Sequence, residues 1–197
     1  MATKYIKDFD VISVRENSGI NIVASMGRKD VSIVSDPTLL MDSHFYHNLT
    51  DSYVSKRTKS YVYSFFIRNF SERKHALKNI FFDKYVIWNN GDNDYTIQGW
   101  LNKIKCADFV VTDSFHCVVM CLKFHVPFIV ITEQKGNIGM NDRFHTLLDF
   151  VGLSNRIIHK SEICLDIIHN FEAVDWNIID KKIDEFVLPG LTLLKGI

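Results

Sequence analysis

One short segment, Thr112-Asp113-Ser114-Phe115-His116, brings several chemically useful groups together directly after an apolar run. Asp113 or Ser114 can accept hydrogen bonds from the free N–H groups of a helix that begins here. His116 would then lie in the first helical turn, where the positive end of the helix dipole disfavours the imidazolium form. A neutral imidazole can act as a general base and, once protonated, as a general acid. The alternative interpretation is a capped helix with a histidine packed near its start.

Three further residues are candidates for binding a ligand: Arg15, Asp36 and Arg143. Arg143 opens an expected helix after a glycine-containing loop, and a guanidinium beside a helix N-terminus is a good anion site. The alternative for Arg143 is a surface arginine without a role. Arg15 follows an expected strand and could reach a ligand, or it could form an ion pair that only ties down a loop. Asp36 precedes Pro37 and could equally organise a turn.

The sequence predicts neither a metal site nor a bound cofactor. Cys117, Cys121 and His125 recur at intervals of four residues on one expected helix, but this spacing matches no zinc pattern. We therefore expect small side chains buried along a packed helix. Residues 136–139 lack the GxGxxG order of a dinucleotide site, and the sequence contains no P-loop.

The elements that would position these residues alternate between strand-like and helix-like segments. Strands are expected at 11–14, 31–35, 61–67, 84–88, 109–111, 127–131 and 156–158. Helices are expected at 18–26, 71–82, 96–106, 115–125, 141–150, 161–170 and 177–187, with caps at Ser18 and Ser71 and a break or kink at Pro189.

This alternation predicts an α/β fold. The strands are uniformly apolar, which is typical of a doubly wound, mostly parallel, Rossmann-like sheet that is buried on both faces. Ligands bind beyond the carboxyl ends of such strands, which is where Thr112 to His116 would lie. Residues 42–60 are polar, and we interpret them as a connector or a domain boundary; residues 89–94 are expected to form a loop.

Composition excludes several classes of protein. The chain has 197 residues, of which 47% are hydrophobic, so disorder is excluded as the main state. Its 23 basic residues balance 23 acidic ones, which argues against a nucleic-acid partner. The start of the chain does not read as a signal peptide, and no apolar stretch is long enough to span a bilayer. The four cysteines form no CxxC pair, so reduced thiols and a cytoplasmic location are expected.

An ordered series of short segments runs through residues 5 to 195. The segments are ISVRENSG at 12–19, SDPTLL at 35–40, Trp100-Leu101, ADFVVTDSFH at 107–116, PFIVI at 127–131, Arg143-Phe144, Leu147-Leu148, Gly152-Leu153 and Arg156. Each segment is weak by itself, but the series in this order resembles the polysaccharide pyruvyl transferase family.

The resemblance implies a fold and a domain division. It implies two Rossmann-like domains of glycosyltransferase-B type with the active site in the cleft between them. Family members are substantially longer than this chain. We therefore expect residues 1–58 to be a remnant of the N-terminal domain plus a connector, and residues 59–197 to be the C-terminal Rossmann-like domain.

The resemblance also implies a reaction, in which a pyruvyl group moves from phosphoenolpyruvate to a pair of sugar hydroxyls as a ketal and phosphate is released. It makes His116 the candidate acid/base and Arg143 a donor-binding residue, with Thr112, Asp113, Ser114, Arg15 and Asp36 as further substrate contacts. Phosphoenolpyruvate is then a substrate, and no other cofactor and no metal is expected. Many members have Arg where this chain has Ser114, and Gly where it has Cys117.

The expected partners are a small-molecule donor and a saccharide acceptor of a surface or exopolysaccharide. A lipid-linked acceptor would bring the protein to the inner face of the membrane, and a homo-oligomer or a separate N-terminal domain could complete the cleft. Two alternatives stay open. One is a glycosyltransferase-B enzyme that uses a nucleotide sugar, for which Glu133 is the only acidic candidate in the loop after the last apolar strand. The other is a non-catalytic, truncated partner domain.

Overall fold

The computed structural model describes residues 2–51, 59–68, 70–80, 86–88, 96–136, 139–164 and 172–196. The chain divides into two compact units. Unit 1 consists of Met1–Leu40, Gln134–Ser154 and Asn177–Ile197, and unit 2 consists of Met41–Glu133 and Asn155–Trp176. Each unit is described by itself. The assignment of residues 1–58 and 59–197 to two domains of different origin stays a prediction.

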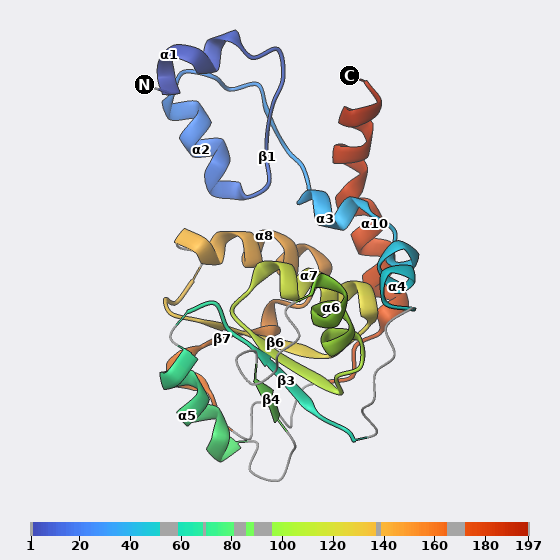
Figure 1. Cartoon of the computed structure of the whole chain (residues 1–197). Helices are drawn as coiled ribbons and strands as arrows, with labels where there is room; N and C mark the ends of the chain where they lie inside the picture. Colours follow the sequence, from blue (N-terminus) through green and yellow to red (C-terminus); the bar gives the residue numbers. More distant parts are fainter. Residues whose placement is uncertain are drawn as a thin grey trace. The chain divides into compact units, whose positions relative to one another are not determined.

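Unit 2 is built on a five-stranded sheet in which every strand pair is parallel (Figure 1). The strands, in spatial order, are β4 (Val86–Trp88), β3 (Val62–Phe65), β5 (Phe109–Thr112), β6 (Phe128–Thr132) and β7 (Ile157–His159). Their apolar runs are buried between helices, as expected for parallel strands. The predicted α/β class and Rossmann-like sheet are confirmed.

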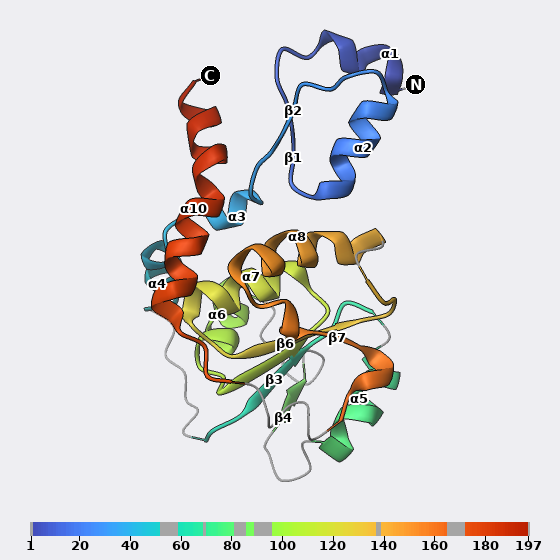
Figure 2. The same ribbon diagram turned by 180° about the vertical axis from the view of Figure 1, so that it is seen from behind.

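Helices flank this sheet on both sides. They are α5 (Phe70–Ile80), α6 (Ile97–Lys105) and α7 (Phe115–Phe124). Figures 1 and 2 show α6 and α7 on one side of the sheet and α5 on the other. Leu77 and Ile80 of α5 belong to one buried apolar cluster with Val111 and Ile129 of the central strands. This packing fixes the carboxyl ends of β3 and β5 in a rigid frame.

The polar segment 42–60 is helical in its first half, because Ser43–Asp51 form helix α4. Its role as a connector or a domain boundary stays a prediction. The polar composition hides a narrow buried face, on which Tyr46 and Thr50 lie one turn apart. The Nζ of Lys105 donates to Thr50 Oγ1 at 2.9 Å, and the ring of His47 packs edge-on against Phe124. Contacts with α6 and α7 thus override a composition that favours loops. Residues 52–58 lie outside the described part of the chain.

Unit 1 contains a parallel pair of strands, β1 (Ile12–Val14) and β2 (Val31–Ile33). Its helices are α1 (Ala2–Tyr5), α2 (Asn17–Ser25), α3 (Pro37–Leu40), α8 (Asp142–Val151) and α10 (Trp176–Lys195). The first residue of α10, Trp176, is assigned to unit 2. The predicted end of α8 is confirmed, since Gly152 takes the left-handed conformation (φ 84°) that ends the helix. The predicted loop at 89–94 and most of the predicted helix at 161–170 lie outside the described residues, and Lys160–Glu162 form only a single 3-10 turn.

The expected break at Pro189 is wrong, because α10 continues through it. Pro189 is exposed, so the carbonyl that loses its N–H partner one turn earlier can bind water. Ile183, Val187 and Gly190 are buried along α10 and hold the helix together on both sides of the proline. Neither α10 nor any other helix in the described ranges is long and apolar enough to cross a membrane.

The start of α2 is capped by another helix rather than by its own serine. Ser18, the expected cap, lies inside α2, and its backbone N–H donates to the carboxylate of Asp142 at 2.6 Å. The N–H of Asn17 donates to Thr146 Oγ1 at 3.2 Å. Side chains of α8 therefore satisfy the first free N–H groups of α2. The expected cap at Ser71 is also wrong, since this residue lies inside α5.

Gly19 is required where α2 crosses β1. A Cβ atom at position 19 would lie 2.7 Å from the Cβ of Val14, which is shorter than any real contact between carbon atoms. We expect Gly19→Ala to lower the free energy of unfolding by about 1–3 kcal/mol, measured by urea denaturation. Val14→Gly, which removes the clashing Cβ, combined with Gly19→Ala should lose less stability than the sum of the two single variants. A Gly19→Ala variant as stable as the parent would contradict the close packing.

Candidate active site

The strand order of unit 2 reverses between β3 and β5, because the chain moves from β3 outward to β4 and then returns to β5. Ligands of doubly wound sheets bind outside the carboxyl ends of the strands at such a reversal. Residues 66–68 follow β3 and residues 112–116 include the end of β5 and the start of α7. We call these two segments together the β3/β5 edge.

Asp113 joins the two segments of the β3/β5 edge. Its carboxylate accepts hydrogen bonds from the backbone N–H groups of Ile67, at 2.7 Å, and Arg68, at 3.1 Å. The Nη1 of Arg73 lies 2.6 Å from the same carboxylate, and the side chains of Arg73 and Asp113 are only 5% and 8% exposed. Asp113 therefore fixes the loop after β3 against the turn that carries His116.

Thr112 and Ser114 shape that turn. The hydroxyl of Thr112 donates to the carbonyl of Phe65 at 2.6 Å and accepts from the N–H of Ser114 at 3.0 Å. The hydroxyl of Ser114 accepts from the N–H of Cys117 at 3.4 Å, so Ser114 is the cap of α7, one of the two caps the sequence left open. Both side chains are buried. These contacts position the first turn of α7.

His116 lies in that first turn, and its side chain is exposed. Its ring stands edge-on to Phe115, with the ring centroids 6.0 Å apart. A rigid turn thus presents an accessible imidazole at the β3/β5 edge, as acid/base chemistry on a bound ligand requires.

Arg68 is a residue of this edge that the sequence analysis missed. It is exposed three residues after the end of β3, and its backbone N–H donates to the carboxylate of Asp113. The signal that could have found it is its place immediately after an apolar strand. Arg68 brings a guanidinium, a group suited to phosphate and carboxylate, to the same edge as His116.

A chain of ion pairs crosses the carboxyl ends of β5, β6 and β7, and it was also missed. Arg73 pairs with Asp113 and, at 2.5 Å, with Glu133, which in turn pairs with Lys160 at 2.8 Å. The hydrogen bond from Lys160 to Glu133, and then the carboxylate charge, raise the pKa of Lys160. Both oxygens of Glu133 are thus engaged, which weakens the case for this residue as a ribose-binding group.

In unit 1, Arg15 and Asp36 form an ion pair with Nη1 and Oδ2 2.6 Å apart. The other oxygen of Asp36 accepts from the N–H of Thr38 at 3.1 Å and from its hydroxyl at 2.7 Å. Asp36 is buried, whereas the side chain of Arg15 is 46% exposed. These are the contacts of a turn-organising aspartate, and Arg15 keeps an accessible surface.

Arg143 is the second residue of α8 and is half-buried, with its guanidinium carbon 5.8 Å from the centroid of the Phe144 ring. The residue before it, Asp142, is committed to the start of α2. Asn141 closes the preceding loop through hydrogen bonds from Nδ2 to the carbonyls of Gln134 and Gly136. Arg143 belongs to unit 1 and His116 to unit 2, so their joint action on one donor stays a prediction.

The described residues contain no group of three His, Cys, Asp or Glu side chains placed to hold a metal ion. Cys117 and Cys121 are fully buried thiols in α7. Burial, and then a hydrogen bond with Cys117, raise the pKa of Cys121 well above its usual value, so this thiol stays protonated. The expectation of small side chains buried along a packed helix is confirmed for Cys117 and Cys121.

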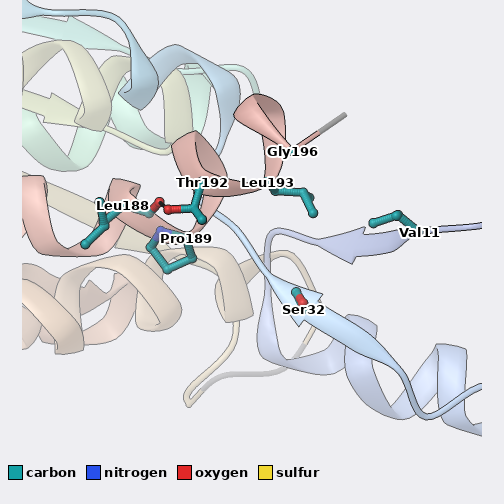
Figure 3. A pocket seen from close by; sticks show the side chains of 7 residues that line it. All are labelled: Val11, Ser32, Leu188, Pro189, Thr192, Leu193 and Gly196. Atoms are coloured by element: carbon teal, nitrogen blue, oxygen red, sulfur yellow. Dashed lines mark hydrogen bonds between the residues drawn. The ribbon is translucent and has the colours of Figure 1, made fainter.

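A pocket of about 560 Å³ in unit 1 has no acidic, basic or thiol side chain among its described lining residues (Figure 3). Its lining residues are Val11, Ser32, Leu188, Pro189, Thr192, Leu193 and Gly196. Among these, Ser32 and Thr192 alone carry polar side chains, and the hydroxyl of Thr192 donates to the carbonyl of Leu188 in its own helix. The β3/β5 edge is therefore the better candidate for an active site.

Comparison with known proteins shows the family to which the chain belongs. A search of curated proteins finds no match to the chain. The family model for polysaccharide pyruvyl transferase matches residues 1–135, which is more than half of the chain. The matched part includes Arg68 and His116, whereas Arg143 lies beyond it. The protein thus belongs to the polysaccharide pyruvyl transferase family, and this membership implies transfer of a pyruvyl group to a polysaccharide.

Proposed function

We propose that the protein transfers the pyruvyl group of phosphoenolpyruvate to two hydroxyls of a saccharide, with His116 as the acid/base. The observation that carries this proposal is the exposed imidazole of His116 on a turn fixed by Asp113 and Ser114, at the point where the strand order reverses. Family membership supports the transferred group and the kind of acceptor.

The reaction needs a proton donor and a proton acceptor. One sugar hydroxyl attacks the carbon that bears the phosphate, and the neighbouring methylene carbon gains a proton and becomes a methyl group. The bond from the attacked carbon to the phosphate oxygen then breaks, and the second hydroxyl closes the ketal on the same carbon. The hydroxyls lose two protons, of which one ends on the methyl group and the other leaves with phosphate. A positioned imidazole such as that of His116 can carry out these transfers in turn.

The donor carries a phosphate and a carboxylate, so it needs a cation and polarised N–H groups. We propose that Arg68 supplies the cation at the β3/β5 edge and that the N-terminus of α7 adds its positive dipole end. Ser114 stands where many family members have an arginine, and we propose that Arg68 takes over the role of that guanidinium.

Calorimetric titration with phosphoenolpyruvate tests this function. We expect saturable binding that Arg68→Ala weakens by roughly 10- to 100-fold, the value of a charge-assisted hydrogen bond. Lys78→Ala is the matched control, because Lys78 is an exposed cation of α5 that is not part of the edge. Equal binding by the parent and Arg68→Ala would refute the donor site. Binding of a uridine nucleotide sugar in place of phosphoenolpyruvate would favour the glycosyltransferase alternative.

A further inference from the structure

Unit 1 contains a second pocket, of about 430 Å³, which we call the α8–α10 pocket. Its lining residues are Asn17, Ile33, His145, Thr146, Asp149, Phe150, Glu185, Phe186 and Pro189. They come from α2, β2, α8 and α10, so four elements far apart in the sequence meet here. This volume lies within the range of pockets that bind small molecules.

The charge of the α8–α10 pocket excludes an anionic ligand. The carboxylates of Asp149 and Glu185 both line it, and none of the nine described lining residues is Lys or Arg. His145 is the one group that can become positive, and its Nδ1 lies 3.4 Å from Asp149 Oδ2. Phosphoenolpyruvate and nucleotides would be repelled by the two carboxylates. The pocket is therefore not a donor site.

The remaining lining is amphipathic. Phe150 is 47% exposed, and its ring centroid lies 5.0 Å from that of Phe186. An exposed aromatic ring offers a flat apolar surface, while the carboxylates and the amide of Asn17 offer hydrogen-bond acceptors beside it. A lipid tail would leave these polar groups buried without partners, which is costly. A sugar ring fits both surfaces, because it has an apolar face of C–H groups and a rim of hydroxyl donors.

We propose that the α8–α10 pocket is a saccharide subsite, in which a neutral or amino sugar packs on Phe150 and donates hydroxyl hydrogen bonds to Asp149 and Glu185. This inference rests on the proposed function only for the origin of the sugar, which would be a unit of the polysaccharide acceptor. A polymeric acceptor occupies more than the site of its two reacting hydroxyls, so a second contact would add affinity by raising the effective concentration of the chain at the enzyme.

Ligand-observed NMR with the methyl glycosides of glucose, galactose and N-acetylglucosamine tests the subsite on the full chain. We expect saturation transfer from the protein to at least one glycoside, strongest at its ring C–H protons. Phe150→Ala and Glu185→Gln should each weaken this binding by roughly tenfold or more. The matched controls are Leu194→Ala and Asp184→Asn, exposed residues of α10 that do not line the pocket, and they should leave binding unchanged.

Three results would overturn the subsite: no transfer to any of the three glycosides, equal transfer in parent and pocket variants, or binding of tetramethylammonium in place of the sugars. Titration of the same samples with phosphoenolpyruvate separates this proposal from the donor site. In the parent chain, donor binding without sugar binding would reject the subsite alone. Sugar binding without donor binding would reject the proposed reaction and leave a saccharide site in place.

Discussion

His116→Ala is expected to lower the rate of pyruvyl transfer by roughly 100- to 10,000-fold, which is the usual contribution of a positioned general acid or base. The side chain of His116 is exposed, so its removal should change the free energy of unfolding little. Release of inorganic phosphate from phosphoenolpyruvate, together with NMR detection of the ketal methyl group on the saccharide, measures the rate. Urea denaturation of the same variant shows that the fold is intact.

His75→Ala provides a matched control, because His75 is an exposed histidine of α5. We expect this variant to keep the parent rate. The assignment of His116 would be contradicted by a variant that transfers pyruvate at the parent rate, or by an equal loss in both variants. Binding of phosphoenolpyruvate should persist in His116→Ala, because the imidazole moves protons whereas Arg68 holds the anion.

The second large effect is expected at Arg73, the buried centre of the ion-pair chain. Its side chain is 5% exposed and holds the carboxylates of Asp113 and Glu133, which are 8% and 30% exposed. Removal of the guanidinium leaves Asp113 buried without its cation, and breaking a buried pair in this way costs about 3–5 kcal/mol. We therefore expect Arg73→Met, which keeps an apolar side chain over Phe66, to lower the free energy of unfolding by about this amount.

Urea denaturation followed by circular dichroism measures this effect. Lys160→Met is the control within the same chain of ion pairs, and its effect should be much smaller because Lys160 is 41% exposed. Arg73→Met combined with Asp113→Asn should recover part of the loss, since no buried charge is then left at position 113. A loss in Arg73→Met no larger than that in Lys160→Met would show that the pair stabilises nothing. If Arg73→Met does not fold, Arg73→Lys tests the same point.

A fall in both transfer rate and donor affinity would be the functional sign of a positioning role for Arg73. Arg73 contacts the candidate site through Asp113, which holds the N–H groups of Ile67 and Arg68, and through the ring of Phe66. Loosening this clamp would displace the turn before His116 and the loop that carries Arg68, and small displacements of reacting groups reduce rates strongly.

Some elements of the site were predicted correctly because their signals are local. The apolar run before Thr112 defines β5, and Ser114 caps the helix that carries His116. Each of these features depends on residues within a few positions of each other, where strand periodicity and helix capping operate.

Other elements were missed because residues far along the chain decide them. The polar segment Ser43–Asp51 becomes a helix through its contacts with Lys105 and Phe124. The start of α2 is capped by Asp142, which is 124 positions away from Ser18. Local sequence patterns do not predict such partners, because these side-chain contacts depend on which elements the fold brings together.

The sequence by itself determined the order of strands and helices, the parallel α/β class and the turn that presents His116. Only the tertiary structure decided that Arg73 pairs with both Asp113 and Glu133, although Glu133 lies 60 positions after Arg73 in the sequence. It also decided that Arg68 and His116 lie at the same edge of the sheet. The physical reason is the strand order. Parallel pairing places the carboxyl ends of β3, β5, β6 and β7 side by side, and this pairing depends on the packing of the whole sheet, which no short stretch of residues encodes.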